Sequence, residues 1–308
     1  MASILGFGAH LPDRVVTAAE LAAQLGVEPD WILEMCGIAE RRYAGPDETV
    51  VDLAERAARR VLEATHMQAA DLGGIMVGTG TAPRAFPGVS ASLQQRLGVG
   101  GMAFDIPLAS VGGFFALCTA ADLAPRLGPI LVVGAEKMSE VVQAYPAKET
   151  TILFGDGAGA CIVSPGEGPL EIVDWIAESD GAFADDLQRE PGGPLVMHGR
   201  QVIMQANRKL KRSIQMLLDR HQRSTSDVDL FLLHQANLNL LNQVAKGLGI
   251  DEERVFVNLQ TRGNTSSASL FIAAAEAQAA GRLRSGDHVV LAAFGSGFSF
   301  GAMLARVR

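Results

Sequence analysis

The sequence predicts an α/β protein in which helices pack in layers against a buried sheet. Five short apolar runs, rich in β-branched residues, look like strands covered on both faces. They are Gly74–Gly78, Pro129–Gly134, Gly159–Val163, Val228–Leu233 and Asp287–Ala293. Segments with helical spacing of apolar residues lie between them: Val50–Thr65, Val89–Leu97, Gly113–Leu123, Ala206–Gln222 and Ser267–Ala280. The 34 glycines and many alanines allow helices to approach the sheet closely.

The two halves of the chain resemble each other. In each half a strand ends in a turn of small and polar residues, IMVGTGTAP in the first and LFLLHQANL in the second. Each half then closes with a strand that runs into glycine, ILVVGAEKM and VVLAAFGSGF. We predict a duplication with two units, residues 1–165 and 166–308, although any α/β protein gives some such echo.

Composition restricts the function. The 308 residues carry 34 acidic and 26 basic side chains, a net charge of −8, which argues against nucleic-acid binding. One basic segment, Asn207–Arg223, could meet an acidic partner, but a solvated helix face is the simpler reading. No apolar run reaches the roughly 20 residues of a membrane span, and no secretion signal is evident. The three cysteines, Cys36, Cys118 and Cys161, are too scattered for disulfides or a metal site. We therefore expect a cytoplasmic protein.

Ser110 is the first candidate for chemistry. It lies in FDIPLASVGGFFAL, where an apolar strand is followed by a sharp turn and an apolar helix. Unpaired N–H groups at a helix start favour developing negative charge, and Gly112 and Gly113 would let a substrate approach the backbone. The alternative is that Ser110 is only a helix N-cap.

Two further candidates lie in the second half. His234 follows an apolar strand in LHQAN, at the expected start of a helix, where it could exchange a proton at the mouth of a pocket. Asn264, in RGNTSSAS, could orient or polarise a carbonyl. Taken singly, a structural histidine and a loop or capping asparagine are the simpler readings.

Two glycine-rich segments complete the set. In FGSGFSFG, the backbone N–H of Ser296 could form an oxyanion hole together with the N–H of Ser110. The segment Phe154–Ala160, FGDGAGA, lacks the Lys-Ser/Thr ending of a nucleotide-binding loop. We expect it to be a tight turn beneath the site.

Together these segments resemble the β-ketoacyl-acyl-carrier-protein synthase III family of the thiolase superfamily. Seven family patterns occur in order along the chain: Trp31–Ile38, Ala85–Pro87, Ala103–Ser110, Phe154–Ala160, His234–Asn237, Gly263–Ser269 and Phe294–Gly301. The resemblance implies a thiolase fold, a five-layered αβαβα subunit that forms a homodimer. It also implies an acyltransferase that condenses an acyl-CoA primer with malonyl acyl carrier protein, without a metal or cofactor.

The resemblance assigns roles by position. His234 and Asn264 match the pair that binds the malonyl thioester carbonyl, and the N–H groups of Ser110 and Ser296 match the oxyanion hole. The substrate-binding positions are Trp31, which stacks on the CoA adenine, Phe86, which closes the partner subunit's acyl pocket, Lys148 near the phosphates, and Phe294.

The departures from the family carry information. Ser110 stands where the family has cysteine, and a hydroxyl needs a general base, for which His234 is the candidate. The residues after Trp31 that stand for the family's Arg-Thr are Met35 and Cys36, so weaker CoA binding is expected. The basic positions for carrier docking are also thinned: Met204 and Asn239 replace a lysine and an arginine, and Lys246 remains.

The leading hypothesis is therefore acyl transfer to Ser110 followed by decarboxylative condensation, in fatty-acid or polyketide synthesis. Acyl transfer without carbon–carbon bond formation is the close alternative. A catalytically silent partner subunit is the third, favoured by the missing cysteine and disfavoured by the retained histidine and asparagine.

Overall fold

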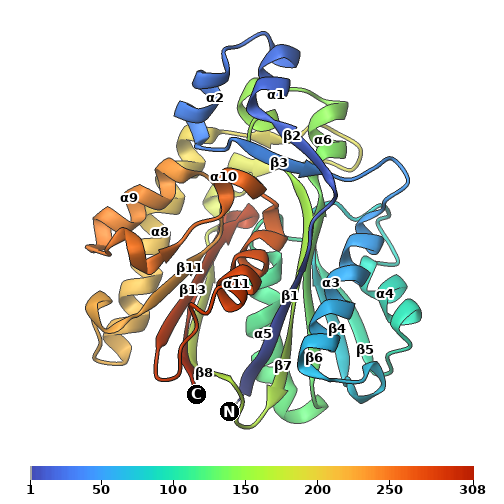
Figure 1. Cartoon of the computed structure of the whole chain (residues 1–308), viewed down its shortest axis with the longest axis vertical. Helices are drawn as coiled ribbons and strands as arrows, with labels where there is room; N and C mark the ends of the chain where they lie inside the picture. Colours follow the sequence, from blue (N-terminus) through green and yellow to red (C-terminus); the bar gives the residue numbers. More distant parts are fainter. Residues whose placement is uncertain (1) are drawn as a thin grey trace.

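The computed structural model describes residues 2–308 and is built on a ten-stranded sheet (Figure 1). The strand order is β12-β11-β13-β14-β8-β1-β7-β6-β4-β5. The first half contributes β1 (Ala2–His10), β4 (Gly74–Gly78), β5 (Met102–Ile106), β6 (Ile130–Lys137) and β7 (Asp156–Pro165). The second contributes β8 (Leu170–Ser179), β11 (Leu230–Leu233), β12 (Val255–Phe256), β13 (His288–Gly295) and β14 (Ser299–Val307).

The same strand order occurs twice. From the centre outward, the first half runs β1-β7-β6-β4-β5 and the second half runs β8-β14-β13-β11-β12. When the five strands of each half are numbered along the chain, both halves therefore read 1-5-4-2-3. The halves join where β1 and β8 pair over Ala2–Ile4 only. This repeat agrees with the internal likeness of the sequence, while the division into two domains at residue 165 stays a prediction.

Helices form three layers around the two halves of the sheet. Helices α3 (Val50–Thr65) and α4 (Val89–Leu97) cover the outer face of the first half, and α8 (Gly199–Arg220) and α9 (Leu238–Leu248) cover that of the second. Between them lie α5 (Gly112–Leu127) and α11 (Ser269–Ala279), which contact strands of both halves. The layers are thus α, β, α, β and α, as predicted.

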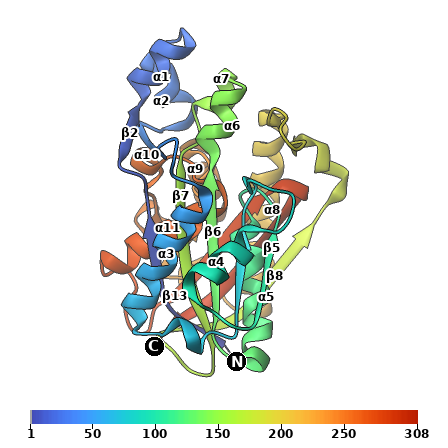
Figure 2. The same ribbon diagram turned by 90° about the vertical axis from the view of Figure 1, so that its right-hand side faces the viewer.

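Smaller elements lie at one end of the molecule, opposite the N- and C-termini of the chain (Figures 1 and 2). They are β2 (Arg14–Thr17), α1 (Ala18–Leu25), α2 (Pro29–Cys36), β3 (Glu40–Tyr43), α6 (Met138–Ala144) and α7 (Lys148–Thr151). The remaining elements are β9 (Leu187–Gln188), β10 (Val196–Met197), α10 (Leu259–Arg262) and the 3-10 turns η1 (Ala69–Asp71), η2 (Gly181–Asp186), η3 (Thr225–Asp227), η4 (Glu252–Arg254), η5 (Ser266–Ala268) and η6 (Ser296–Phe298).

The expected turn at Phe154–Ala160 is wrong, because Asp156 opens β7. Its buried carboxylate accepts hydrogen bonds from the N–H of Ala44 at 2.7 Å, the N–H of Ser139 at 2.7 Å and the hydroxyl of Ser139 at 2.5 Å. Burial raises the pKa of Asp156 to about 6. The aspartate therefore fastens the start of β7 to α6 and to the loop after β3.

The two halves touch backbone to backbone next to η5. A Cβ atom added at Gly134, on β6, would stand 2.0 Å from the carbonyl oxygen of Ser267, and one at Gly113, on α5, would stand 2.6 Å from the same atom. A side chain at Gly134 would require the turn to move, because real Cβ atoms do not come within 3.0 Å of other heavy atoms. Glycine is therefore needed there to seat the turn of the second half against β6 and α5.

Within residues 2–308 no helix has both the length and the apolar character to cross a membrane. The three cysteines are free and buried.

Candidate active site

The site lies at the carboxyl ends of parallel strands from both halves. Parallel neighbours β4, β5 and β6 end there in the first half, and β11 and β13 end there in the second. Ligands of α/β sheets bind at such strand ends because the following loops can carry functional side chains over a rigid base. Ser110 follows β5, His234 follows β11 and Ser296 follows β13.

Ser110 occupies a sharp connection between β5 and α5. Its φ of 69° lies in the left-handed region, where a residue with a Cβ is strained, and the residue as a whole is 8 % exposed. Helix α5 begins at Gly112 with Val111 as its cap, so the reading of Ser110 as an N-cap is wrong. The turn is held from the second half, because a Cβ at Gly295 would stand 2.0 Å from the carbonyl oxygen of Ala109.

His234 is buried and held in one orientation. Its Nδ1 lies 2.5 Å from the hydroxyl oxygen of Ser269, which also accepts a hydrogen bond from the N–H of Gln235 at 3.1 Å. With that acceptor position filled, the Ser269 hydroxyl is free to donate to Nδ1, which leaves the ring proton on Nε2. Burial lowers the pKa of His234 to about 3, so the ring is neutral at physiological pH. Helix α9 begins only at Leu238, so the expectation that His234 opens a helix is wrong.

Asn264 lies on the loop between α10 and η5. Its backbone N–H donates to the carbonyl of Leu153 at 2.9 Å, and its carbonyl accepts from the N–H of Gly155 at 3.0 Å. The side-chain Oδ1 accepts from the N–H of Ser266 at 2.8 Å, while Nδ2 has only a long contact of 3.4 Å to the carbonyl of Ala236. The amide group therefore presents its Nδ2–H donors to the site.

Ser110, His234 and Asn264 line one small cavity of about 60 Å³. Phe294 lines it too, with its ring edge-on to His234 at a centroid distance of 5.2 Å. The rest of the lining is Leu153, Phe154, Leu187, Met197, Gly199, Val202, Ile203, Ala236, Asn237 and Leu240. A hydroxyl, a neutral imidazole and a carboxamide thus face one largely apolar space.

The structure gives His234 and Ser110 no direct hydrogen bond within residues 2–308. With Nδ1 bonded to Ser269 and the proton on Nε2, His234 is set to donate a hydrogen bond into the cavity. A role for His234 as the base that activates Ser110 stays a prediction.

Both N–H groups expected to form the oxyanion hole have protein acceptors here. The N–H of Ser110 donates to the hydroxyl oxygen of Ser266 at 2.8 Å, and that of Ser296 donates to the carbonyl of Ala109 at 3.1 Å. A substrate oxyanion would have to replace these acceptors. The assignment of the oxyanion hole stays a prediction.

The other expected substrate residues lie outside the cavity lining. Trp31 is partly buried on α2, Lys148 is exposed at the start of α7, and Phe86 is 84 % exposed on the loop after β4. The cavity does not bring these three side chains to Ser110. Their roles in binding stay predictions.

Glu136 and Ser266 also belong to the site, although neither is among the site residues that the sequence predicts. Glu136 is a fully buried carboxylate near the end of β6, and Ser266 is a second serine in the left-handed region, with φ of 50°. The Ser266 hydroxyl donates to Glu136 Oε1 at 3.0 Å and accepts the N–H of Ser110. The single charged residue in the apolar run ILVVGAE was the available signal.

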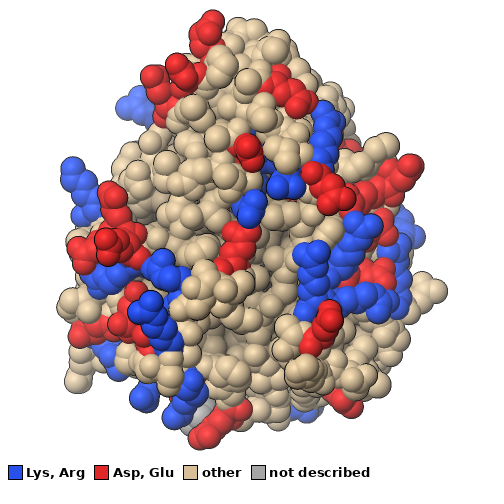
Figure 3. Space-filling view, viewed as in Figure 1, with Lys and Arg blue, Asp and Glu red and all other residues tan. Residues whose placement is uncertain are grey.

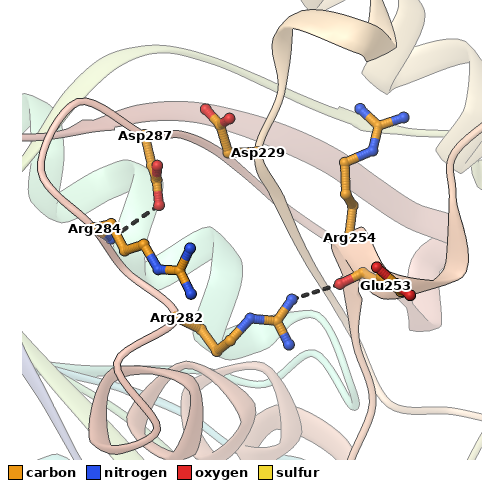
Figure 4. A pocket seen from close by; sticks show the side chains of 6 residues that line it. All are labelled: Asp229, Glu253, Arg254, Arg282, Arg284 and Asp287. Carbon is orange, nitrogen blue, oxygen red and sulfur yellow. Dashed lines mark hydrogen bonds between the residues drawn. The ribbon is translucent and has the colours of Figure 1, made fainter.

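A wider pocket of about 570 Å³ lies at the opposite, amino ends of β11 and β13 (Figure 4). Its lining has three arginines and three acids: Asp229, Glu253, Arg254, Arg282, Arg284 and Asp287. Figure 3 likewise shows acidic and basic side chains interspersed over one face of the molecule. The balanced charges of this pocket favour neither an anion nor a cation, and the pocket shares no residue with the cavity of Ser110.

Two segments of the chain match models of a known protein family. Residues 104–181 match the family model 3-oxoacyl-[acyl-carrier-protein] synthase III, and residues 218–307 match the model of its C-terminal part. The β-ketoacyl-[acyl-carrier-protein] synthase III of Alkalilimnicola ehrlichii is 38% identical over 322 residues, which cover 99% of each chain.

Solved structures resemble this chain over its whole length. The 3-oxoacyl-[acyl-carrier-protein] synthase III from Aquifex aeolicus matches with a TM-score of 0.95 and 34% identity, covering 99% of this chain and 100% of that one. The priming β-ketosynthase from the R1128 polyketide biosynthetic pathway matches with a TM-score of 0.91 and 29% identity, covering 100% and 96%. These matches confirm the predicted thiolase fold.

Proposed function

Because the chain belongs to the 3-oxoacyl-[acyl-carrier-protein] synthase III family, it is an acyltransferase of the condensing type, and we propose that Ser110 is its nucleophile. In this proposal Ser110 takes an acyl group from a thioester. The acyl group then joins the carbon that malonyl acyl carrier protein exposes when it loses carbon dioxide. The observation that carries the proposal is the shared cavity of Ser110, His234 and Asn264.

His234 and Asn264 have the chemistry that decarboxylation needs. Loss of carbon dioxide leaves an enolate whose charge collects on the thioester oxygen. Two neutral donors, Nε2–H of His234 and Nδ2–H of Asn264, can stabilise that oxygen in a small and largely apolar cavity. Because both donors are uncharged, neither would hold the malonyl carboxylate in place and so oppose its loss.

Ser110 also supports a second candidate, acyl transfer without condensation. An oxygen ester is a poorer acyl donor to carbon than a thioester, so a serine enzyme could instead pass its acyl group to an oxygen or nitrogen nucleophile. A silent partner subunit gains less support, because the donors of His234 and Asn264 are held in place by Ser269 and Ser266.

Mass spectrometry and decarboxylation together distinguish these functions. On incubation with a panel of acyl-CoA and acyl-carrier thioesters, we expect one acyl group on the peptide that contains Ser110. Addition of malonyl-carrier protein should then release carbon dioxide and a 3-oxoacyl product. An adduct without carbon dioxide release would indicate plain acyl transfer, and the absence of both would indicate a silent subunit.

We also propose that two copies assemble through the β5 edge of the sheet. The other sheet edge, β12, has two residues, whereas β5 has five and carries Met102, which is 44 % exposed. Long apolar edges are normally paired or covered. The neighbouring Phe86 is 84 % exposed, a large apolar side chain that would be buried by a second copy.

The carrier protein would approach over α8. The basic segment there is smaller than the sequence suggested, because Lys209 is buried and ion-paired with Asp180 at 2.5 Å. A hollow on this helix is lined by Arg200, Ile203, Met204, Asn207, Arg208, Lys211 and Gln243, and Ile203 also lines the cavity of Ser110. The basic side chains thus stand beside the route to the nucleophile, where an acidic carrier could dock.

Reversing two of these charges should weaken the reaction with the carrier substrate. For Arg208→Glu combined with Lys211→Glu we expect KM for malonyl-carrier protein to rise about 10-fold or more, with a smaller effect at high salt. The reaction with malonyl-CoA serves as the internal comparison. Arg126→Glu, at the far end of α5, is the control variant. Equal losses with both substrates would count against docking at this surface.

A further inference from the structure

A chain of hydrogen bonds leads from Ser110 into the protein interior. The hydroxyl oxygens of Ser110 and Ser266 lie 3.4 Å apart, and Ser266 Oγ lies 3.0 Å from Glu136 Oε1. Ser266 also accepts the N–H of Ser110 at 2.8 Å. All three residues are buried, with exposed fractions of 8 %, 1 % and 0 % for Ser110, Ser266 and Glu136.

The direction of this chain follows from the partners of Glu136. Its carboxylate accepts the N–H of Gly80 at 3.0 Å and the hydroxyl of Thr81 at 2.7 Å, and the N–H of Ser267 lies 3.4 Å away. Backbone N–H groups can only donate, so they favour the carboxylate form. The Ser266 hydroxyl must then donate to Glu136, and its lone pairs are left to accept from Ser110.

Burial opposes the charge that these donors favour. It raises the pKa of Glu136, while the bonds from Thr81, Gly80, Ser267 and Ser266 lower it. Because burial is the larger effect and the pKa is raised, the Glu136 carboxylate is a stronger base than a carboxylate in water. His234 is poorly suited to the same task, because its pKa is lowered to about 3 and its Nδ1 is bonded to Ser269.

We propose that Glu136 is a positioning residue that acts on Ser110 through Ser266, as the proton acceptor at the end of the chain Ser110–Ser266–Glu136. The inference rests on the proposed role of Ser110 as the acyl acceptor. Glu136 would provide the base that a serine nucleophile requires, because a hydroxyl is a much weaker acid than the thiol of a cysteine.

The step balances over one catalytic cycle. As Ser110 Oγ bonds to the thioester carbon and the C–S bond breaks, the Ser110 proton passes to Ser266, and the Ser266 proton passes to Glu136. The thiolate leaves and takes a proton from water. When the acyl group moves on to the enolate carbon, Ser110 Oγ keeps the electron pair of the broken C–O bond and recovers its proton from Glu136 through Ser266.

The test compares the same variants with serine and with cysteine at the nucleophile position. We expect Ser266→Ala and Glu136→Gln to slow acylation by about 100-fold or more, the usual contribution of a general base. In the Ser110→Cys background the same changes should cost less than about 5-fold, because a thiol ionises without this help. The rate is read by mass spectrometry of the acylated peptide after quenching.

Two features separate this role from a purely structural one. Ser139→Ala removes a hydrogen bond to a different buried carboxylate, Asp156, and leaves Glu136 and its bonds unchanged, so its effect should be the same in both backgrounds. Ser266→Ala keeps a residue with a Cβ at the left-handed position, and thermal unfolding checks that each variant is folded. If Ser266→Ala and Glu136→Gln slow acylation equally with serine and with cysteine at position 110, the proposed role of Glu136 is wrong while the proposed function stands. If the unaltered protein forms no acyl adduct, both the proposed function and the role of Glu136 are wrong.

Discussion

Ser110→Ala is expected to abolish acyl transfer while leaving malonyl decarboxylation in place. The alanine side chain has no nucleophile, so no covalent adduct can form, and we expect condensation to fall at least about 1000-fold. His234 and Asn264 keep their own partners, Ser269 and Ser266, and can still stabilise an enolate. The measurement is product formation together with carbon dioxide release, both followed at saturating malonyl-carrier protein.

Ser110→Cys is the companion variant for this experiment. A thiol at the start of α5 gains thiolate character from the helix dipole, and the thioester it forms is a better acyl donor to carbon. Faster condensation would indicate that the rest of the synthase site is intact. Retention of full condensation by Ser110→Ala would rule out Ser110 as the nucleophile.

His234→Ala is expected to produce the opposite pattern, with acylation less affected than decarboxylation. Removing one of two donors to the enolate oxygen should slow carbon dioxide release by about 100- to 1000-fold, as for other lost oxyanion donors. Asn264→Ala, which removes the second donor, is the matched comparison. Loss of acylation as large as the loss of decarboxylation would instead make His234 the base for Ser110.

The same histidine makes a pH prediction with a defined sign. Burial lowers the pKa of His234 from 6.5 to about 3, so the unfolded chain binds a proton there at a pH where the folded chain does not. Its contribution to stability is complete above pH 6.5 and is lost as the pH falls towards 3. The difference in unfolding free energy between the unaltered protein and His234→Ala should therefore shrink between pH 7 and pH 4. Above pH 5 the rate of decarboxylation should show no inflection from this group.

Elements with strong local signals were predicted well. The bounds of α3, α4 and β4 agree with the sequence, since α3 has an amphipathic pattern and a capping box in which Thr49 and Asp52 exchange hydrogen bonds. Helix α8 begins at Gly199 rather than Ala206. Its buried Lys209 was read as a surface charge, because a charge pattern cannot show a pairing with Asp180 across the fold.

The sequence predicts three residues of the candidate site, but it does not predict the hydrogen bonds that connect the site to the protein interior. Ser110 and His234 follow strands, and Asn264 stands in a motif on the loop after α10, so position along the chain indicates all three. The bond from Ser266 to Glu136 joins residues 130 positions apart, and its partners depend on how the two halves meet. Strand β1 was also missed, since its small residues, ASILGFGAH, show neither alternation nor a long apolar run.

The contact between Gly134 and the carbonyl of Ser267 bears on how chains of this kind can be recombined. A chimera joined near residue 165 would take β6 from one parent and the η5 turn from the other. The contact between Gly134 and Ser267 would then form between segments from two different proteins. A displacement there would pass directly to Ser266 and Asn264. Exchange of α1 and α2, which contain neither Gly134 nor Ser267, would leave both partners of this contact from the same parent. We therefore expect a chimera that exchanges only α1 and α2 to fold, and a chimera that exchanges a whole half of the chain to fold poorly.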